Sequence, residues 1–141
     1  MTTKKLGVFL LSYKRPDFVQ ESINSILAQD FNDFDLIVSE NTPDDSVVKQ
    51  LKQYLSDQRL RLIKRTPSLP SLEHFNLVLS ETLKYEYVML FHDDDILMPH
   101  ALTKMLQALE KNPFATAAAC NALIIKNSDH TDILLSPNIK T

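Results

Sequence analysis

Residues 85–99 read YEYVMLFHDDDILMP, and this stretch decides the predicted fold. Its apolar run from Tyr87 to Phe91 is short, continuous and bounded by polar residues, which is typical of a strand buried on both faces. His92 and an aspartate run follow directly, and Pro99 opens a segment with helical spacing. The stretch therefore predicts a parallel strand whose carboxyl end carries clustered acidic side chains.

The acidic cluster Asp93-Asp94-Asp95 needs a neutralising partner, because adjacent carboxylates repel one another. The carboxyl ends of strands in open α/β sheets are where ligands bind, so a metal site is our preferred interpretation. The alternative is a solvated turn in which an aspartate caps the next helix.

Composition excludes several classes of protein. The 141 residues, 44% of them hydrophobic, suit one compact domain or one half of a larger one. The net charge of −3, without a basic face, argues against a nucleic-acid partner. The single cysteine, Cys120, permits no internal disulfide, and we expect it to be a small buried hydrophobe.

Neither a signal peptide nor a transmembrane segment is predicted, which favours a cytoplasmic protein. The single glycine, Gly7, excludes the glycine-rich phosphate cradles of P-loop and dinucleotide-binding proteins. It also excludes the glycine-rich loop of sugar nucleotidyltransferases. An anionic ligand must therefore be met by a few placed cations or by a metal ion.

Apolar runs alternate with helical stripes along the chain, which predicts an α/β fold with a mostly parallel sheet and helices on both faces. Strands are expected near residues 6–12, 34–39, 60–65, 86–91 and 115–125, and helices are expected to begin near Pro16, after Thr42 or Asp44, at an N-cap Ser71, and at Pro99. The inward faces are expected to carry Phe18, Val19, Ser22, Ile23, Ile26 and Leu27 in the first helix, Val47, Val48, Leu51, Tyr54 and Leu55 in the second, Leu72, Phe75, Leu79 and Leu83 in the third, and Leu102, Met105, Leu106 and Leu109 in the fourth. From Lys126 onward the chain is expected to be irregular.

Polar residues end three of these strands, in Ser12-Tyr13-Lys14-Arg15, Ser39-Glu40-Asn41 and His92-Asp93-Asp94-Asp95. The carboxyl ends of parallel strands converge on one edge of the sheet. A tyrosine ring, an acceptor carboxylate and a cation-binding aspartate together suit a nucleoside diphosphate, because the cation can bridge phosphate oxygens that no glycine nest holds.

At this point the sequence resembles the inverting family 2 glycosyltransferases of the GT-A fold, over residues 4–125. LLSYKRP at residues 10–16 is similar to the family's strand followed by S/T-Y-N-x-P, with Lys14 in place of asparagine. SILAQDF at residues 25–31 resembles S-I-L-x-Q-x-F, and VSENT at residues 38–42 resembles V-x-D-N/D-x-S. FHDDDILMPHAL at residues 91–102 resembles L-D-x-D-D-x-x-x-P-x-x-L, with His92 in place of the first aspartate. Of the family's G-x-x-x-A-R-N segment only Asn76 is kept.

The resemblance implies a Rossmann-like nucleotide-sugar transferase half and assigns its site residues. Those implied to bind the nucleotide sugar are Ser12, Tyr13, Arg15, Glu40, Arg65 and Asp93, and those implied to bind Mn²⁺ or Mg²⁺ are Asp94 and Asp95. The implied reaction moves a hexose from a nucleoside-diphosphate sugar, a UDP-sugar being favoured, to a hydroxyl of a glycan or lipid-linked acceptor, in cell-surface polysaccharide synthesis.

The domain expectation is a donor-binding α/β domain over residues 1–125 and an irregular tail over 126–141, the start of an acceptor-binding half. No pattern marks a general base, although Asp129 and Asp132 lie in that tail. The longer protein is expected at the inner face of the membrane.

Two functions from other classes stay open: a nucleotide-sugar binding module without transfer activity, and a receiver-type signalling domain. Receivers carry their acidic pair after the first strand, where this chain has Ser12-Tyr13. Simpler roles also stay open for individual residues. Tyr13 could pack on the first helix, Glu40 and Asn41 could be turn residues, Arg15 and Arg65 could be solvated, and His74 and His100 are expected at the surface.

Overall fold

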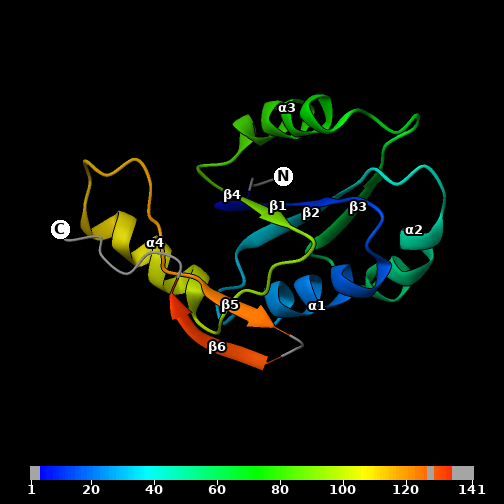
Figure 1. The fold of residues 1–141 in the computed structure, drawn as a ribbon. Helices are drawn as coiled ribbons and strands as arrows, with labels where there is room; N and C mark the ends of the chain where they lie inside the picture. Colours follow the sequence, from blue (N-terminus) through cyan, green and yellow to red (C-terminus); the bar gives the residue numbers. More distant parts are fainter. Residues whose placement is uncertain (1–3, 127–128, 135–141) are drawn as a thin grey trace. The chain divides into compact units, whose positions relative to one another are not determined.

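The computed structural model describes residues 4–126 and 129–134 and divides into two compact units, residues 1–101 and 102–141. The first unit holds a four-stranded parallel sheet in the order β3-β2-β1-β4 (Figure 1). Its strands are β1 (Leu6–Ser12), β2 (Phe34–Glu40), β3 (Leu60–Lys64) and β4 (Tyr87–His92). The predicted strands and their parallel arrangement are therefore confirmed for this unit.

Helices cover both faces of this sheet, as expected. The helices of the unit are α1 (Pro16–Leu27), α2 (Ser46–Leu51) and α3 (Ser71–Glu81), with short 3₁₀ turns at Lys52–Tyr54 and Thr82–Lys84. In Figure 1, α3 lies on one face and α1 and α2 lie on the other. Every residue of β1 and β2 is buried, because both strands are interior and both of their faces are covered.

β4 differs from the prediction that it is buried on both faces. It is the edge strand of the sheet, and Val88 exposes 41% of its surface while Phe91 exposes 7%. The apolar run alone cannot distinguish an edge strand from a central one, because strand order is set by tertiary pairing.

The single glycine has a packing role in β1. A Cβ atom on Gly7 would lie 2.6 Å from Cδ2 of Tyr85, whose ring packs edge-on against Phe9. The Tyr85 hydroxyl donates a 2.7 Å hydrogen bond to Oδ2 of Asp35. Only glycine at this position therefore lets the ring reach the sheet.

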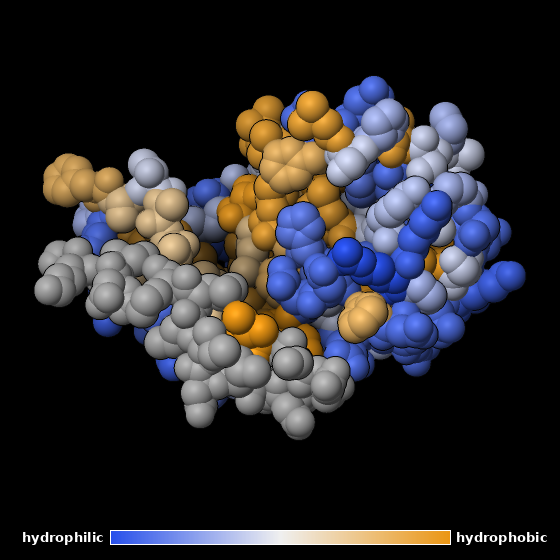
Figure 2. Space-filling model, in the orientation of Figure 1, coloured by the Kyte–Doolittle hydropathy of each residue, from blue (hydrophilic) through white to orange (hydrophobic). Residues whose placement is uncertain are grey.

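The predicted inward faces are right for α1 and α2 in the main and wrong for α3. Phe18 and Leu55 are exceptions in the first two helices, at 55% and 53% exposed. The residues predicted to face inward are the exposed ones: Leu72 (71%), Phe75 (36%) and Leu79 (46%) in α3, and Leu83 (87%) in the 3₁₀ turn that follows it. The buried residues of that helix are His74 and Val78. Figure 2 shows hydrophobic side chains gathered at the top centre, where Figure 1 draws α3.

Two predicted helix starts are also shifted. The N-cap of α3 is Pro70, so Ser71 is the first helical residue. α4 (Ala101–Lys111) begins after Pro99, because His100 has a left-handed backbone with φ 64° and does not continue a helix. His100 is exposed, as expected, and its Nδ1 lies 2.7 Å from Oδ2 of Asp30.

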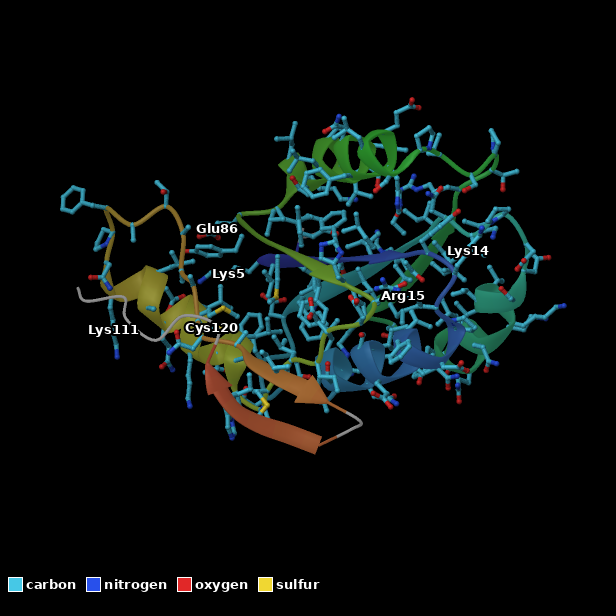
Figure 3. The ribbon with its side chains drawn as sticks, in the orientation of Figure 1. Lys5, Lys14, Arg15, Glu86, Lys111 and Cys120 are labelled. Atoms are coloured by element: carbon cyan, nitrogen blue, oxygen red, sulfur yellow. The ribbon has the colours of Figure 1, made fainter. Side chains whose placement is uncertain are left out.

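The second unit corrects the prediction of a fifth strand at residues 115–125 and of an irregular tail after it. Residues 117–122 form no regular structure, and a short antiparallel hairpin follows, β5 (Leu123–Lys126) with β6 (Asp129–Leu134), in a separate sheet. Cys120 is exposed rather than buried (Figure 3). The residues around Cys120 are mostly alanine, which is depleted in strands and brings little side-chain area to bury. The rest of the predicted tail, residues 127–128 and 135–141, lies outside the described residues.

Candidate functional site

A cavity of about 410 Å³ opens at the carboxyl ends of β1 and β4, beside the first turns of α3. Its walls come from three places in the sequence and are lined by Leu11, Ser12, Tyr13, Lys14, Arg15, Ser71, His74, Phe75, His92 and Asp93. The sheet topology explains this convergence, because β1 and β4 are neighbouring parallel strands that end at the same edge.

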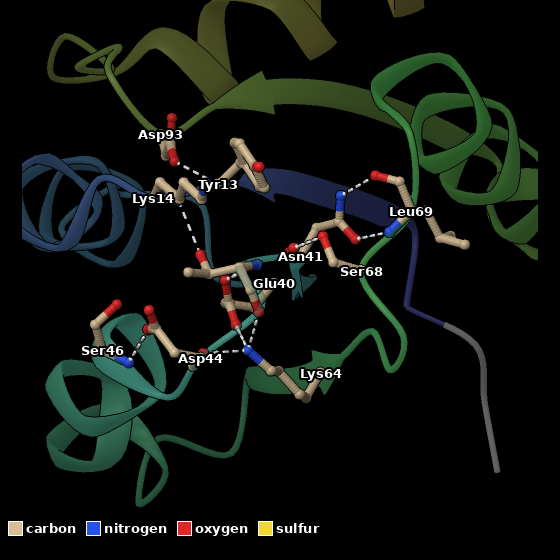
Figure 4. Close-up of polar contacts among 11 residues, drawn as sticks. Tyr13, Lys14, Glu40, Asn41, Asp44, Ser46, Lys64, Ser68, Leu69 and Asp93 are labelled. Carbon is tan, nitrogen blue, oxygen red and sulfur yellow. Dashed lines mark hydrogen bonds and ion pairs between the residues drawn. The ribbon is translucent and has the colours of Figure 1, made fainter.

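Asp93 is the buried acidic group of the cavity, at 4% exposed. Its Oδ2 accepts a 2.8 Å hydrogen bond from the backbone N–H of Tyr13 (Figure 4), and its Oδ1 lies 3.4 Å from Nη1 of Arg15. Burial raises the pKa of the Asp93 carboxyl above its usual value, although the Tyr13 amide and the Arg15 charge act in the opposite direction. The carboxylate thus joins the ends of β1 and β4.

Arg15 neutralises the acidic run. Its Nη1 pairs with Oδ2 of Asp94 as well as with Asp93, so one guanidinium bridges both carboxylates. Figure 3 places Lys14 and Arg15 together in the turn between β1 and α1. Asp95 is exposed to solvent. The repulsion expected within the acidic run is therefore met by a cation from the protein and by water.

Polar side chains of α1 hold the loop that follows the acidic run. The Ser22 hydroxyl donates to the backbone oxygen of Asp95 at 2.6 Å, and Nε2 of Gln29 donates to the backbone oxygen of Met98 at 3.0 Å. The Ser25 oxygen accepts the backbone N–H of Leu97 at 2.9 Å. These contacts give SILAQ a structural purpose: its serine and glutamine fix the acidic loop against the first helix.

Ser12 carries the one buried side-chain polar atom without a hydrogen-bond partner among the described residues, its Oγ. The residue is 1% exposed and lines the cavity. An unpaired buried hydroxyl costs about 1–3 kcal/mol, so it marks a place where a ligand can complete the structure. The neighbouring rings of Tyr13 and Phe75, 46% and 36% exposed, offer flat apolar faces to the same cavity.

Glu40 is fully buried and both of its oxygens are engaged (Figure 4). Oε1 accepts the backbone N–H of Thr42 at 2.6 Å, and Oε2 accepts Nζ of Lys64 at 2.7 Å. The same ammonium also donates to the backbone oxygens of Thr42 and Asp44. Glu40 does not line the cavity. Its predicted contact with a base stays a prediction, and the structure adds a role in holding the loop after β2.

Arg65 is paired within the protein rather than solvated. Its guanidinium forms a two-pronged pair with Glu81, at 2.9 and 2.7 Å, and its Nε donates to Oγ of Ser39 at 2.8 Å. The same Ser39 oxygen lies 2.8 Å from Nε2 of His74, which is 5% exposed and not at the surface as expected. Burial lowers the pKa of His74, and the Arg65 charge lowers it further. Both effects favour the neutral form of the His74 imidazole.

Asn41 fixes the approach to α3. Its side chain exchanges two hydrogen bonds with the backbone of Leu69, at 2.8 and 2.9 Å, and its backbone oxygen accepts the Ser68 hydroxyl at 2.5 Å (Figure 4). This clamp sets where the helix begins beside the cavity.

The predicted site residues divide into two groups. Ser12, Tyr13, Arg15 and Asp93 line the cavity, and Asp94 joins them through Arg15. Glu40 and Arg65 lie outside the cavity lining, and Asp95 faces solvent. Sequence reasoning missed the contribution of α3, which adds Ser71, His74 and Phe75 to the cavity lining. The sequence offers one signal for this contribution: His74 and Phe75 stand in the segment that departs from the family's G-x-x-x-A-R-N motif.

Comparison with known families identifies the chain. The model of a family described as Glycosyl transferase family 2 matches residues 8–136. The chain belongs to this family. It is 27% identical over 135 residues to the O-antigen biosynthesis glycosyltransferase WbnJ of Escherichia coli, covering 94% of this chain and 52% of that protein. It is 24% identical over 121 residues to Protein CgeD of Bacillus subtilis strain 168, covering 81% of this chain and 28% of that one. The chain thus spans between about a quarter and about half of the length of these relatives.

Solved structures share the fold. The chain superposes on residues 1–349 of S. aureus TarS in complex with UDP-GlcNAc with a TM-score of 0.67 at 19% identity, covering 77% of this chain and 32% of that one. A second structure of TarS 1–349, whose name records no ligand, superposes with a TM-score of 0.68 and also covers 77% of this chain. The predicted Rossmann-like GT-A architecture is confirmed. None of the helices in the described part of the chain is long and apolar enough to cross a membrane.

The family's divalent cation can be tested against these side chains. The described residues contain no group of three or more His, Cys, Asp or Glu side chains arranged to hold a metal ion. Mg²⁺ and Mn²⁺ need fewer protein ligands, because one or two carboxylates suffice when substrate phosphates complete the shell. Asp94 exposes 46% of its side chain at the cavity edge and offers such a carboxylate once Arg15 releases it. The residues fit a cation that binds together with a phosphate ligand.

Proposed function

We propose that this chain is the donor-binding portion of a glycosyltransferase that moves a sugar from a nucleoside-diphosphate sugar, a UDP-sugar being favoured, to an acceptor hydroxyl. The observation that supports it most is the cavity itself: a buried unpaired Ser12 hydroxyl and a buried Asp93 carboxylate at the carboxyl ends of β1 and β4, in a family 2 chain. The name of the similar TarS structure records a UDP-GlcNAc complex, which favours uridine.

The cavity has a positively charged side and an uncharged side. Lys14 and Arg15 lie on the β1 turn and suit the diphosphate, whereas the lining residues of α3 are uncharged when His74 is neutral. Asp93 can accept hydrogen bonds from ribose hydroxyls with its remaining lone pairs. The exposed rings of Tyr13 and Phe75 suit a planar base, which would share the Tyr13 ring with Lys14, whose Nζ lies 5.1 Å from the ring centroid. We therefore orient the base towards α3 and the phosphates towards the turn after β1.

Asp94 is the proposed protein ligand of Mn²⁺ or Mg²⁺, with Asp95 as a supporting acceptor. A bound cation would supply charge stabilisation to the departing diphosphate. Arg15 can serve the same end without a metal: it leaves Asp94 and pairs with phosphate oxygens, for which its planar fork is suited. Arg65 and Glu40 then act at a distance, by holding Ser39 and the loop after β2.

The acceptor and the setting are proposed from the relatives. The name of WbnJ assigns that protein to O-antigen biosynthesis, so we propose a glycan or lipid-linked acceptor in cell-surface polysaccharide synthesis, at the cytoplasmic side of the membrane. The general base is expected in the part of the longer relatives that this chain does not match.

Calorimetry with UDP in Mn²⁺-containing buffer tests the proposal. We expect binding by the wild-type chain and a clear loss in Asp93→Asn, which removes the carboxylate charge with little change in shape. Asp45→Asn, at an exposed carboxylate outside the cavity, is the matched control and should bind normally. Wild-type protein that binds no nucleoside diphosphate contradicts the proposal. Binding without sugar transfer in a parallel assay with acceptor would favour the binding-module alternative.

A further inference from the structure

His74 stands out because it is buried, lines the cavity and has no counterpart in the motifs that the sequence matches. It belongs to a continuous series of contacts that runs from Glu81 through Arg65 and Ser39 to its own Nε2. Each link is 2.9 Å or shorter. A series of this kind fixes the position and the protonation pattern of its last member.

The donor and acceptor roles in this series follow from Arg65. A guanidinium only donates, so the Ser39 oxygen accepts from Arg65 Nε. The Ser39 hydroxyl proton then needs an acceptor in a fully buried place, and an unprotonated Nε2 of His74 is at 2.8 Å. Neutral His74 therefore carries its proton on Nδ1 and presents a donor there.

The second ring nitrogen is available to a ligand. Nδ1 of His74 makes no hydrogen bond within the described part of the chain, and Ser12 Oγ is the one unpaired side-chain atom there that solvent does not reach. Nδ1 is therefore accessible, and the residue lines the cavity between Ser71 and Phe75. A fixed donor beside exposed aromatic faces is suited to read the edge of a planar ring.

We propose that His74 is a specificity-determining residue of the donor site, whose Nδ1–H donates a hydrogen bond to the C4 carbonyl oxygen of a bound uracil. The inference rests on the proposed function and assigns the base. Uracil carries an acceptor at C4, whereas cytosine carries an amino donor there. A fixed donor therefore forms a hydrogen bond with uracil and meets a second, unfavourable donor in cytosine. The site selects UDP over CDP for this reason.

Two substitutions separate the contacts of the two ring nitrogens. Counted in bonds from Cβ, the amide of glutamine reaches the position of Nε2 and that of asparagine reaches the position of Nδ1. His74→Gln therefore keeps a partner for Ser39 and removes the donor facing the cavity. His74→Asn keeps a donor near the cavity and removes the partner of Ser39.

Calorimetric titration of the full chain with UDP and with CDP, in Mn²⁺, provides the test. We expect wild type to prefer UDP, His74→Gln to lose most of that preference, by about tenfold or less for one neutral hydrogen bond, and His74→Asn to keep part of it. A merely structural role for His74 would lower both affinities together and leave their ratio unchanged. An unchanged ratio in His74→Gln, or no preference in wild type, overturns the inference while leaving the proposed function standing. Wild type that binds neither nucleotide contradicts both.

The tautomer of the His74 imidazole can be measured without a ligand. Nitrogen-15 NMR of the imidazole distinguishes a proton on Nδ1 from one on Nε2. We expect the proton on Nδ1 in wild type and a mixed population in Ser39→Ala, which removes the hydroxyl that donates to Nε2. A proton on Nε2 in wild type overturns the inference.

Discussion

At the scale of single residues, Lys14 departs from ordinary backbone geometry. Its φ is 56°, in the left-handed region, where a side chain with a Cβ costs about 1–2 kcal/mol and asparagine is tolerated better. Its backbone N–H donates to Oγ1 of Thr42 at 2.8 Å, which holds the turn in this conformation. The motif that this turn resembles has asparagine at the same place, and the structure supplies the reason.

Lys14→Asn should therefore raise the free energy of unfolding by about 0.5–1 kcal/mol, because the new residue relieves the left-handed strain. Denaturant unfolding measures the change. Lys14→Ala is the control, since it removes the charge and keeps the strain, and it should bring no gain. Equal gains in both variants would assign the effect to charge and contradict the strain account.

The acidic run allows a second prediction at this scale, on the proposed cation. Mn²⁺ should bind weakly alone and more tightly with UDP, because phosphate oxygens complete the shell around Asp94. Asp94→Asn should abolish the metal-dependent gain in UDP affinity, and Asp95→Asn should reduce it by about tenfold at most. Titration of Mn²⁺ with and without UDP decides between them. A full gain in Asp94→Asn would remove this residue from the metal site.

At the scale of elements, α3 shows what a sequence pattern can miss. Its leucine and phenylalanine stripe is amphipathic at helical spacing, and that pattern predicts the stripe to face inward. The structure buries His74 and Val78 instead, because the Ser39 hydroxyl satisfies the imidazole and removes the cost of burying it. The pattern cannot show a hydrogen bond to a residue 35 positions away.

Substitutions on the two faces of α3 check this orientation. Leu72→Lys, at a residue of α3 that is 71% exposed, should change the free energy of unfolding by about 0.5 kcal/mol or less. Val78→Ala, at a residue 0% exposed, should cost about 2 kcal/mol. Thermal or denaturant unfolding separates them. The reverse order of effects would restore the orientation that the sequence predicted.

The attachment of α3 also predicts a pH dependence. The pKa of His74 is lowered in the folded chain, so below the unfolded value of 6.5 the unfolded chain binds more protons and stability falls as the pH falls. The slope is at most about 1.4 kcal/mol per pH unit. The pKa of Asp93 is raised in the folded chain. Between pH 3.8 and that raised pKa, this carboxyl therefore makes stability rise as the pH falls.

We expect the loss on acidification to be smaller in His74→Gln, measured by denaturant unfolding at a series of pH values. Asp93→Asn removes the opposing contribution, so it should show a steeper loss than wild type. A His74→Gln profile identical to that of wild type would show that the imidazole has the same pKa in the folded and the unfolded chain. This result would contradict the proposed effect of burial.

At the scale of the whole molecule, the parallel order of the first unit could be predicted because apolar strands and helices alternate strictly through residue 101. The convergence of Ser12, Tyr13 and Asp93 followed from that order alone. Glu40 and Arg65 show the limit of the same reasoning: a position at a strand end does not reveal that Lys64, Ser39 and Glu81 already occupy these side chains. The fifth strand failed for a related reason, since composition cannot specify the partner of a strand.

The central claim, that the cavity at the ends of β1 and β4 binds a nucleoside diphosphate, is tested most directly by a crystal structure of the chain with UDP and Mn²⁺. We predict density for UDP in that cavity, with the uracil beside Tyr13 and Phe75, the ribose near Asp93 and the diphosphate at Arg15 and Asp94. UDP bound in the crystal at another surface, with this cavity filled only by water, would contradict the account.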